Sequence, residues 1–415
     1  MTGVALSWIV ILVATLVILT RWKKVFEARD ISLFLPFSVR MFLTNDPVNN
    51  HSQFKKMNAQ LEGPSSIFLS NGELFICDSY NHRIRKVLRN GSIVTICGTQ
   101  EMGYNGDGQP ATLSQLNLPK NVVVSSSNQV YISDSVNHRI RKILCDGTIV
   151  TIAGTGERSF KYDGEGQPAV NAKLCNPQGL FVTDDEEILF CDTGASRVRK
   201  IDRNGILWTI VGNGQKGLNG IKQAKEMRLD DPTSVFMYKK EIYITDSNNN
   251  RILKILQNGN VIRLAGNRND RDNVEGLSVP KSVFVHKDEI YFSDRGNHQI
   301  KKIRANGTIA TIAGIGEGGY SGDGGLAIHA QLCHPAGLFV DHLDQVYVAD
   351  SYNSRIRKID SDGIITTIVG STGGYAGDVL FEFEKYPHIG PKKRLGIESK
   401  AFYDIIIATT LDDRH

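Results

Sequence analysis

One unit, repeated six times, constrains the fold of this chain more than any other sequence feature. Each copy has a proline before a short apolar run, at Pro64, Pro119, Pro177, Pro232, Pro280 and Pro335. Each copy also has an aspartate at the end of a second apolar run, at Asp78, Asp134, Asp192, Asp246, Asp294 and Asp350. By subtraction, successive aspartates lie 56, 58, 54, 48 and 56 residues apart. This period matches one four-stranded blade and predicts a β-propeller with six blades.

Four short β-branched or aromatic runs lie within each copy, and those of the first are SIFL, LFICD, RIRKV and IVTI. The third and fourth runs are joined by Asn90-Gly91, Asp146-Gly147, Asn204-Gly205, Asn258-Gly259, Asn306-Gly307 and Asp362-Gly363. These pairs predict type I′ hairpin turns, which need positive φ at both residues. Because a lone four-stranded sheet buries too little apolar surface to be stable, the sheets are expected to stack into a closed, all-β ring.

The residues around the third run resemble a known repeat. The stretches SYNHRIRK, SVNHRIRK, GNHQIKK and SYNSRIRK resemble the NHL repeat, whereas TGASRVRK and SNNNRILK of the third and fourth copies depart from its loop pattern. Two loops between copies, GYNGDGQPA from Gly103 and GYSGDGGLA from Gly319, resemble those of large extracellular and bacterial NHL proteins, including the NHL segment of teneurins. The resemblance implies a six-bladed NHL-type β-propeller over residues 63–372.

The first residues predict a membrane anchor. Residues 4–19 read VALSWIVILVATLVIL without a charge, and the uncharged stretch 3–20 is about long enough to cross a hydrocarbon core. The basic run RWKK follows from Arg21 and nothing basic precedes, so an uncleaved single-pass transmembrane helix is expected rather than a signal peptide. The predicted organisation is an anchor with a basic flank at 1–24, an apolar juxtamembrane linker at 25–62, the propeller at 63–372 and a divergent tail at 373–415.

The basic flank favours a cytoplasmic position for the propeller. N-glycosylation sequons at Asn50, Asn90 and Asn306 leave an extracellular or lumenal position open, and glycans on Asn50 or Asn306 would contradict the cytoplasmic one. The net charge of +4 is too small to indicate a polyanionic partner. The six cysteines include no CxxC pair, and we expect those at matching repeat positions to be small buried side chains.

The third run is basic in every copy. Its cations are Arg83, Arg85, Lys86, Arg139, Arg141, Lys142, Arg197, Arg199, Lys200, Arg251, Lys254, Lys301, Lys302, Arg355, Arg357 and Lys358. Such a ring would suit phosphates, and some NHL propellers bind RNA on a basic face. We instead expect the repeated aspartates to form ion pairs with arginines of this run, the structural set being Arg83, Arg139, Arg197, Arg251 and Arg355. Aromatic platforms for single strands are not evident, so nucleic acid is not an expected partner.

Three histidines, His82, His138 and His298, occupy one position in copies one, two and five. Three imidazoles can hold zinc. The family resemblance adds a precedent, since the lyase that completes peptide amidation shares the NHL architecture and uses zinc bound by histidines of several blades. The equivalent residues of the other copies are Ser196, Asn250 and Ser354, so the histidines do not come from alternate blades. A metal-dependent lyase or hydrolase in the central channel is therefore an alternative hypothesis, and no metal or cofactor is predicted.

Strand order assigns recognition to one face, which carries the turns between second and third strands and the long inter-blade loops such as 99–118. Candidate ligand contacts on this face are Asn81, His82, Asn137, His138, Asn249, Asn297, His298 and Asn353. The Gly-Asp loops at Asp107, Asp163, Asp323 and Asp378 are expected to be tight turns rather than calcium sites. The predicted function is a membrane-anchored, non-enzymatic scaffold for a protein or other macromolecule.

Overall fold

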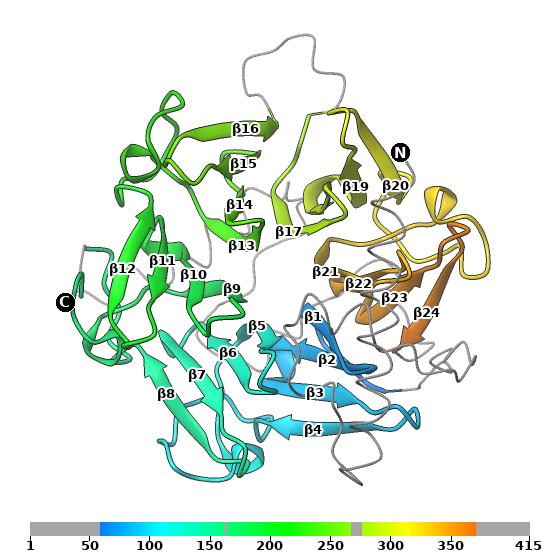
Figure 1. Ribbon diagram of the computed structural model, residues 1–415. Coiled ribbons are helices and arrows are strands. Elements are labelled where there is room, and N and C mark those ends of the chain that lie inside the picture. Colours follow the sequence, from blue (N-terminus) through cyan, green and yellow to red (C-terminus); the bar gives the residue numbers. More distant parts are fainter. Residues whose placement is uncertain (1–58, 162–163, 267–275, 371–415) are drawn as a thin grey trace, which may run out of the picture. The chain divides into compact units, whose positions relative to one another are not determined.

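The computed structural model describes residues 59–161, 164–266 and 276–370 (Figure 1). The predicted anchor at 1–24, the part of the linker up to residue 58 and the predicted tail at 373–415 lie outside the described residues. Within the described ranges, no helix is long and apolar enough to span a membrane. The described chain consists of short β-strands joined by turns, loops and single 3-10 turns.

Six antiparallel sheets of four strands make up the described chain, and the strands of each sheet pair in sequence order. Blades one to three contain β1 (Pro64–Ser70), β2 (Glu73–Asp78), β3 (Arg83–Val87), β4 (Ile93–Cys97), β5 (Pro119–Val124), β6 (Val130–Asp134), β7 (Arg139–Ile143), β8 (Ile149–Ala153), β9 (Pro177–Val182), β10 (Ile188–Asp192), β11 (Arg197–Ile201) and β12 (Leu207–Val211). Blades four to six contain β13 (Pro232–Tyr238), β14 (Glu241–Asp246), β15 (Arg251–Ile255), β16 (Val261–Ala265), β17 (Pro280–His286), β18 (Glu289–Asp294), β19 (Gln299–Ile303), β20 (Ile309–Ala313), β21 (Pro335–Val340), β22 (Val346–Asp350), β23 (Arg355–Ile359) and β24 (Ile365–Val369). This confirms the predicted six-bladed, all-β fold.

The first strand of every blade lies at the centre of the ring (Figure 1). Each inner strand packs beside the inner strand of the next blade, and β21 of blade six packs against β1 of blade one. An apolar cluster crosses this last junction, where Ile67 and Ile76 of blade one meet Tyr347 and Ile356 of blade six. Clusters of the same kind lie between the other neighbouring blades. The ring is therefore closed, and the burial of apolar surface between the sheets stabilises it.

Single 3-10 turns occur at two recurrent places. Between second and third strands lie η2 (Ser79–Asn81), η5 (Thr193–Ala195), η7 (Arg295–Asn297) and η9 (Ser351–Asn353). In the loops between blades lie η3 (Ala111–Leu113), η4 (Ala169–Asn171), η6 (Ala224–Glu226) and η8 (Ala327–His329). We call the face formed by these second-to-third-strand turns and inter-blade loops the loop face.

Phenylalanines of the inner strands form a belt around the middle of the ring, with Phe68, Phe181, Phe236, Phe284 and Phe339 at the fifth residue of their strands. Ring centroids of neighbours along the belt lie 4.6 to 5.4 Å apart, in tilted or edge-to-face arrangements. Val123 takes the equivalent place in blade two. Aromatic pairs at these distances attract one another beyond simple burial, so the belt adds to the contacts that hold the inner strands together.

The hairpins between third and fourth strands differ from the predicted turn type. In blade one Gly91 has φ of 83°, but Asn90 is not among the residues with positive φ. The N–H of Leu88 donates to the carbonyl of Ser92 and the N–H of Gly91 donates to that of Leu88, which is the pattern of a type I turn followed by a left-handed glycine. Asn90 Oδ1 accepts the Ser92 N–H at 2.9 Å and holds this conformation. The same restriction of positive φ to the glycine recurs in the other blades, so the prediction of type I′ turns was wrong.

Positive φ at two successive residues occurs instead between the first and second strands. Asn71 and Gly72 have φ of 50° and 71° in blade one, and Lys239 and Lys240 have φ of 50° and 63° in blade four. Two-residue hairpins therefore lie on the side of the ring opposite the loop face. These connections are short, which leaves the loop face as the side with variable surface.

Candidate functional site

A buried aspartate organises the loop face of every blade. One oxygen of each repeated aspartate accepts a backbone N–H, at 2.7 to 2.8 Å, from the second residue before the repeated proline, namely Glu62, Asn117, Cys175, Asp230, Ser278 or Cys333. Burial raises the pKa of Asp134, Asp192, Asp246 and Asp350 to about 6, against the opposing effect of their hydrogen bonds. The carboxylate thereby holds the chain that enters the blade against the end of the second strand of the same blade.

The basic partner of this aspartate is not the same residue in every blade. Asp78 and Asp246 form ion pairs with the predicted arginines, Arg83 at 3.2 Å and Arg251 at 2.7 Å. In blades two, three and six the guanidinium that reaches the carboxylate stands two residues later, on Arg141 at 3.3 Å, Arg199 at 3.6 Å and Arg357 at 3.4 Å. In blade five the partner is Lys301 at 2.9 Å. Residues two apart on a strand share one face, so either position can supply the cation.

The predicted asparagine contacts are used within the fold. Asn137 Nδ2 donates to Asp134 at 2.8 Å and to the carbonyl of Gly103 in the incoming loop at 2.6 Å. The corresponding amides make the same two bonds, to the aspartate and to an incoming loop, at Asn249, Asn297 and Asn353. Asn81 bonds to Asp78. Both N–H bonds of these amides are thus occupied where the loop is bound, which leaves only the Oδ1 atom for a ligand.

The three repeated histidines lie at junctions between blades. The Nδ1 atoms of His82, His138 and His298 accept backbone N–H groups from the following blade, at 3.1, 3.2 and 3.1 Å. Their partners are Leu118, Asn176 and His334, which precede the repeated proline with φ of 45° to 47°. This bond compensates a strained backbone, because left-handed conformations are costly for residues other than glycine. Asn250 Oδ1 makes the same bond to Val279 in blade four.

This bond also bears on the zinc hypothesis. A neutral imidazole that accepts at Nδ1 carries its proton on Nε2, so neither nitrogen offers a free lone pair to a metal. Burial lowers the pKa of all three histidines and keeps the rings neutral. Within the described ranges, His82 and His138 belong to no group of potential metal ligands. The arrangement suits a structural role better than a tripod for zinc.

Hydroxyl groups make a second contact between blades. The residue after the repeated aspartate donates to the carbonyl of the repeated proline of the next blade, from Ser79 at 2.6 Å, Thr193 at 2.7 Å and Ser247 at 2.6 Å, and from Ser135 and Ser351 in the same way. Ser351 reaches Pro64, which joins blade six to blade one. Blade five has Arg295 at this position, so its junction with blade six is built differently.

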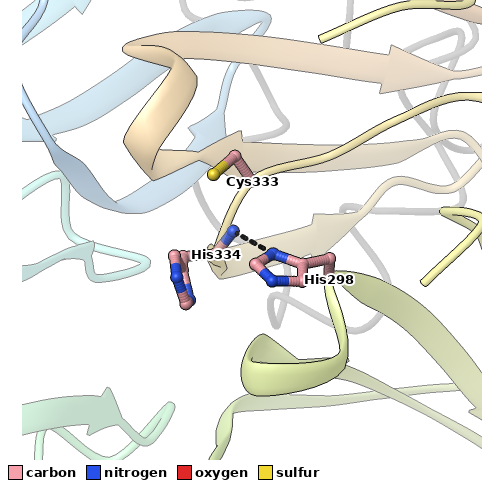
Figure 2. Close-up of side chains that lie close together, drawn as sticks. All are labelled: His298, Cys333 and His334. Carbon is pink, nitrogen blue, oxygen red and sulfur yellow. Dashed lines mark hydrogen bonds between the residues drawn. The ribbon is translucent and has the colours of Figure 1, made fainter. Parts of the chain in front are cut away.

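Figure 2 shows this exceptional junction, where His298, Cys333 and His334 lie close together. The His334 ring packs against His298 with centroids 4.5 Å apart and against Tyr352 at 4.4 Å. The guanidinium of Arg295 lies 5.3 Å from the centre of the Tyr352 ring. Burial, together with the nearby charge of Arg295, lowers the pKa of His334 to about 3. The sequence reasoning missed His334 and Cys333, although His334 is the one histidine among the residues that precede the repeated prolines.

The ligand atoms of these three residues lie within 4.8 Å of one another, a spacing that a metal site would need. Their chemistry does not fit one. His298 Nδ1 accepts the His334 N–H (dashed in Figure 2), which places a proton on its other nitrogen. Burial raises the pKa of the Cys333 thiol to about 11, and the neighbouring Arg295 repels a cation. The cluster is better described as aromatic and cationic packing at the junction of blades five and six.

The centre of the ring offers little room. Between the inner strands lies a cavity of about 20 Å³, lined by residues that include Lys120, Gln178, Thr233 and Lys281. This space suits one or two water molecules. Lys281 Nζ donates to Gln178 Oε1 at 2.7 Å, and burial beside Arg295 lowers the pKa of Lys281 to about 7. A substrate of ordinary size does not fit there, so recognition is to be sought on the surface.

Exposed apolar side chains gather in the loops between blades. Among the described residues, ten of the sixteen exposed large apolar side chains stand in these loops: Met102, Tyr104, Leu113, Phe160, Val170, Leu218, Ile221, Ile315, Leu326 and Ile328. Tyr80 and Val136 add two more in the turns between second and third strands. A second hollow, of about 600 Å³, lies between blades one and two, where Lys86 on its wall pairs with Glu73 at 3.0 Å. Where such side chains form a contiguous patch they are typical of contact surfaces, so these loops are the candidate binding surface.

The basic third strand does not present a free cationic face. Eleven of its sixteen predicted cations form ion pairs with carboxylates of the described chain, and these are Arg83, Arg85, Lys86, Arg141, Arg199, Lys200, Arg251, Lys254, Lys301, Lys302 and Arg357. Arg139 and Arg197 donate to backbone carbonyls. Charges that are neutralised within the fold contribute little to phosphate binding.

The closed ring and the repeated turn with its aspartate, asparagine and histidine together define an NHL-type propeller. The sequence model of the teneurin NHL domain family matches residues 35–144, 145–316 and 315–379. The chain belongs to this family.

The curated relatives described next are much longer than this chain. Teneurin-4 of Mus musculus is 26% identical over 327 residues, which cover 74% of this chain and 10% of the relative. Protein SUPPRESSOR OF QUENCHING 1, chloroplastic, of Arabidopsis thaliana is 32% identical over 177 residues, which cover 40% of this chain and 16% of the relative. The chain thus spans about a tenth of the length of the teneurins it matches.

Solved structures show the same fold. A structural genomics protein of unknown function from Bacteroides thetaiotaomicron superposes with a TM-score of 0.52 and 15% identity, over 72% of this chain and 70% of that chain. An auxiliary nutrient binding protein from the same organism superposes with a TM-score of 0.51 and 17% identity, over 74% of this chain and 70% of that chain. At this identity the likeness concerns the fold alone.

The junction histidines make stability depend on pH. Asn250 makes in blade four the bond that His138 makes in blade two, so His138→Asn keeps an acceptor but removes the titrating ring. The pKa of His138 is about 4 in the folded chain and 6.5 when unperturbed, so between these values the unfolded chain binds more protons. The free energy of unfolding therefore falls as the pH falls from 6.5 to 4. Urea denaturation should show similar stability of wild type and variant near neutral pH, and a loss of about 1–2 kcal/mol in wild type relative to the variant near pH 4, a value reduced for the partial exposure of the ring. Parallel pH profiles would contradict this role.

Proposed function

We propose that this chain is a non-enzymatic binding propeller that holds a protein ligand on its loop face. The observation that carries the proposal is the gathering of exposed apolar side chains in the inter-blade loops. Protein interfaces use such side chains, mixed with polar atoms, as their anchors. Rigid blades beneath the loops support this use, because a scaffold that does not move on binding loses less conformational entropy.

The alternatives find less support in the described residues. Enzymatic chemistry in the channel would need room for a substrate and available metal ligands, whereas the cavity holds about 20 Å³ and the histidines accept backbone N–H groups. RNA binding would need unpaired cations, whereas most cations of the third strands pair with carboxylates. A protein ligand is therefore the best-supported occupant of the loop face.

Site-specific photo-cross-linking in intact cells tests this proposal. A photo-reactive amino acid in place of Phe160 reports on the loop face, and one in place of Leu343, on the opposite side and equally exposed, is the matched control. We expect discrete protein adducts from position 160 and none, or far weaker ones, from position 343. Equal labelling at both positions, or adducts with RNA alone, would contradict the proposal.

We further propose that residues 4–19 hold the propeller at a membrane, with the propeller on the cytoplasmic side. The support is the uncharged apolar stretch and the basic run after it, which lie outside the described residues. The full chain is expected to stay with membranes after alkaline extraction and to carry no glycan at Asn50 or Asn306. Replacing Leu12 and Val13 by Arg should release it, because charges at the centre of a span are costly. Extraction of the wild-type chain by alkali would contradict the anchor, and glycans at either site would contradict the orientation.

A further inference from the structure

The central cavity is lined by the residues with which the inner strands begin. Each inner strand starts with its repeated proline on the loop-face side, and the residues directly after these prolines are Ser65, Lys120, Gln178, Thr233, Lys281 and Ala336. The next residue of every inner strand is uncharged. All residues that line the cavity come from these two positions. The wall is therefore made of amide and hydroxyl groups and of two lysines, and it contains no carboxylate.

The two lysines differ in their surroundings. The Nζ atom of Lys120 lies 5.6 Å from the centre of the Tyr80 ring. The Nζ atom of Lys281 instead donates to Oε1 of Gln178 at 2.7 Å, and within residues 59–161, 164–266 and 276–370 it forms no ion pair. An ammonium group has three N–H donors, so two of them are left at the cavity. A lysine inside a protein is almost always paired with an acid, which makes one that is bonded only to a neutral amide exceptional.

The charges near Lys281 do not supply the missing partner. Burial and the positive charge of Arg295 lower the pKa of Lys281 to about 7. Asp231 acts in the opposite direction, but the carboxylate lies 3.9 Å from the Nζ atom of Lys216, which shares its charge. The surroundings of Lys281 thus carry an excess of positive charge, and an uncompensated charge of this kind is costly inside a protein.

A small anion compensates this charge better than water does. Water molecules would occupy the free N–H groups of Lys281 but would leave its charge without a partner. Gln178 and Ser282 also line the cavity, and an amide NH2 group and a hydroxyl group can donate to an anion. Chloride is only slightly larger than a water molecule. Sulfate and organic carboxylates are too large for a cavity of about 20 Å³.

We propose that the central cavity binds a chloride ion, held by Lys281 and by donors of Gln178 and Ser282. The ion supplies the negative charge that the inner strands lack. Lys281 belongs to blade five and Gln178 to blade three, so the ion joins blades that are not neighbours in the ring. Chloride thereby stabilises the propeller from inside the channel, and the site is separate from the exposed loops proposed to bind a protein.

Thermal unfolding of the full-length protein in sodium chloride and in sodium gluconate of equal concentration tests the site. Gluconate is too large for the cavity and keeps the ionic strength the same. The measurement is made at about pH 6, below the Lys281 pKa of about 7, so that the ammonium is charged. We expect a melting temperature about 3 °C higher in chloride, at ten times its dissociation constant, than in gluconate. Equal melting temperatures in the two salts would overturn the proposal.

Two variants assign this response to the cavity. Gln178→Glu keeps the shape of the side chain and places a carboxylate where the amide oxygen already accepts from Lys281, so it builds a counter-ion into the wall. Lys281→Gln removes the charge instead. Both variants are expected to melt at the same temperature in chloride and in gluconate. Lys222→Gln, at an exposed lysine of the loop before blade four, is the control and should keep the full response. A wild-type response to chloride in Gln178→Glu would overturn the site.

Anomalous scattering from a crystal soaked in bromide locates the ion without any variant. Bromide has the charge of chloride and nearly its size, so we expect an anomalous peak between the inner strands, beside Lys281 and Gln178. Peaks on the outer surface together with an unoccupied cavity would overturn the proposal. That result would leave the protein-binding function of the loop face untouched.

Discussion

The buried carboxylate at the end of each second strand is the interaction on which the rest of the propeller depends. It accepts the incoming backbone, pairs with a basic side chain of the third strand and, in five blades, binds the asparagine of its own turn. Leaving such a group without partners inside the protein would cost several kcal/mol, so the stability of the blade depends on these contacts. They fix the turn that follows, and in blades one, two and four a hydroxyl group and a histidine or asparagine of this turn bond to the following blade.

Because the repeated residues make these structural contacts, they are poor candidates for ligand recognition. Their hydrogen bonds are made within the fold. The inner strands carry the phenylalanine belt and enclose a small polar cavity. What varies from blade to blade is the loop surface and the junction of blades five and six. There Arg295 replaces the usual hydroxyl, and His334 and Tyr352 pack beside it. The features that differ between the blades of this chain therefore lie mainly in its loops.

The sequence predicted the number of blades, the four strands of each and the closed ring, because prolines, aspartates and apolar runs recur in register. It located the hairpins between third and fourth strands but not their turn type. In blade one a bond to the Asn90 side chain selects a type I turn. It predicted that Arg139 pairs with Asp134, which was wrong: Arg141 makes this pair, while Arg139 stacks on Tyr104 of a loop more than thirty residues earlier in the chain, a contact that the repeat pattern does not show. The contact of His298 with His334 was not predicted either, because it also joins residues far apart in the sequence. The histidine at position 334, where the other repeats have other residues, was a signal that could have indicated it.

Closure of the ring is the central claim, and the bond from Ser351 to the carbonyl of Pro64 tests it most directly, because it joins residues 287 apart in the sequence. Urea denaturation of Ser351→Ala should show a single transition and a loss of about 1–2 kcal/mol, the same as for Ser79→Ala, which removes the equivalent bond between blades one and two. A Ser351→Ala variant as stable as wild type, beside a destabilised Ser79→Ala variant, would contradict the closed ring.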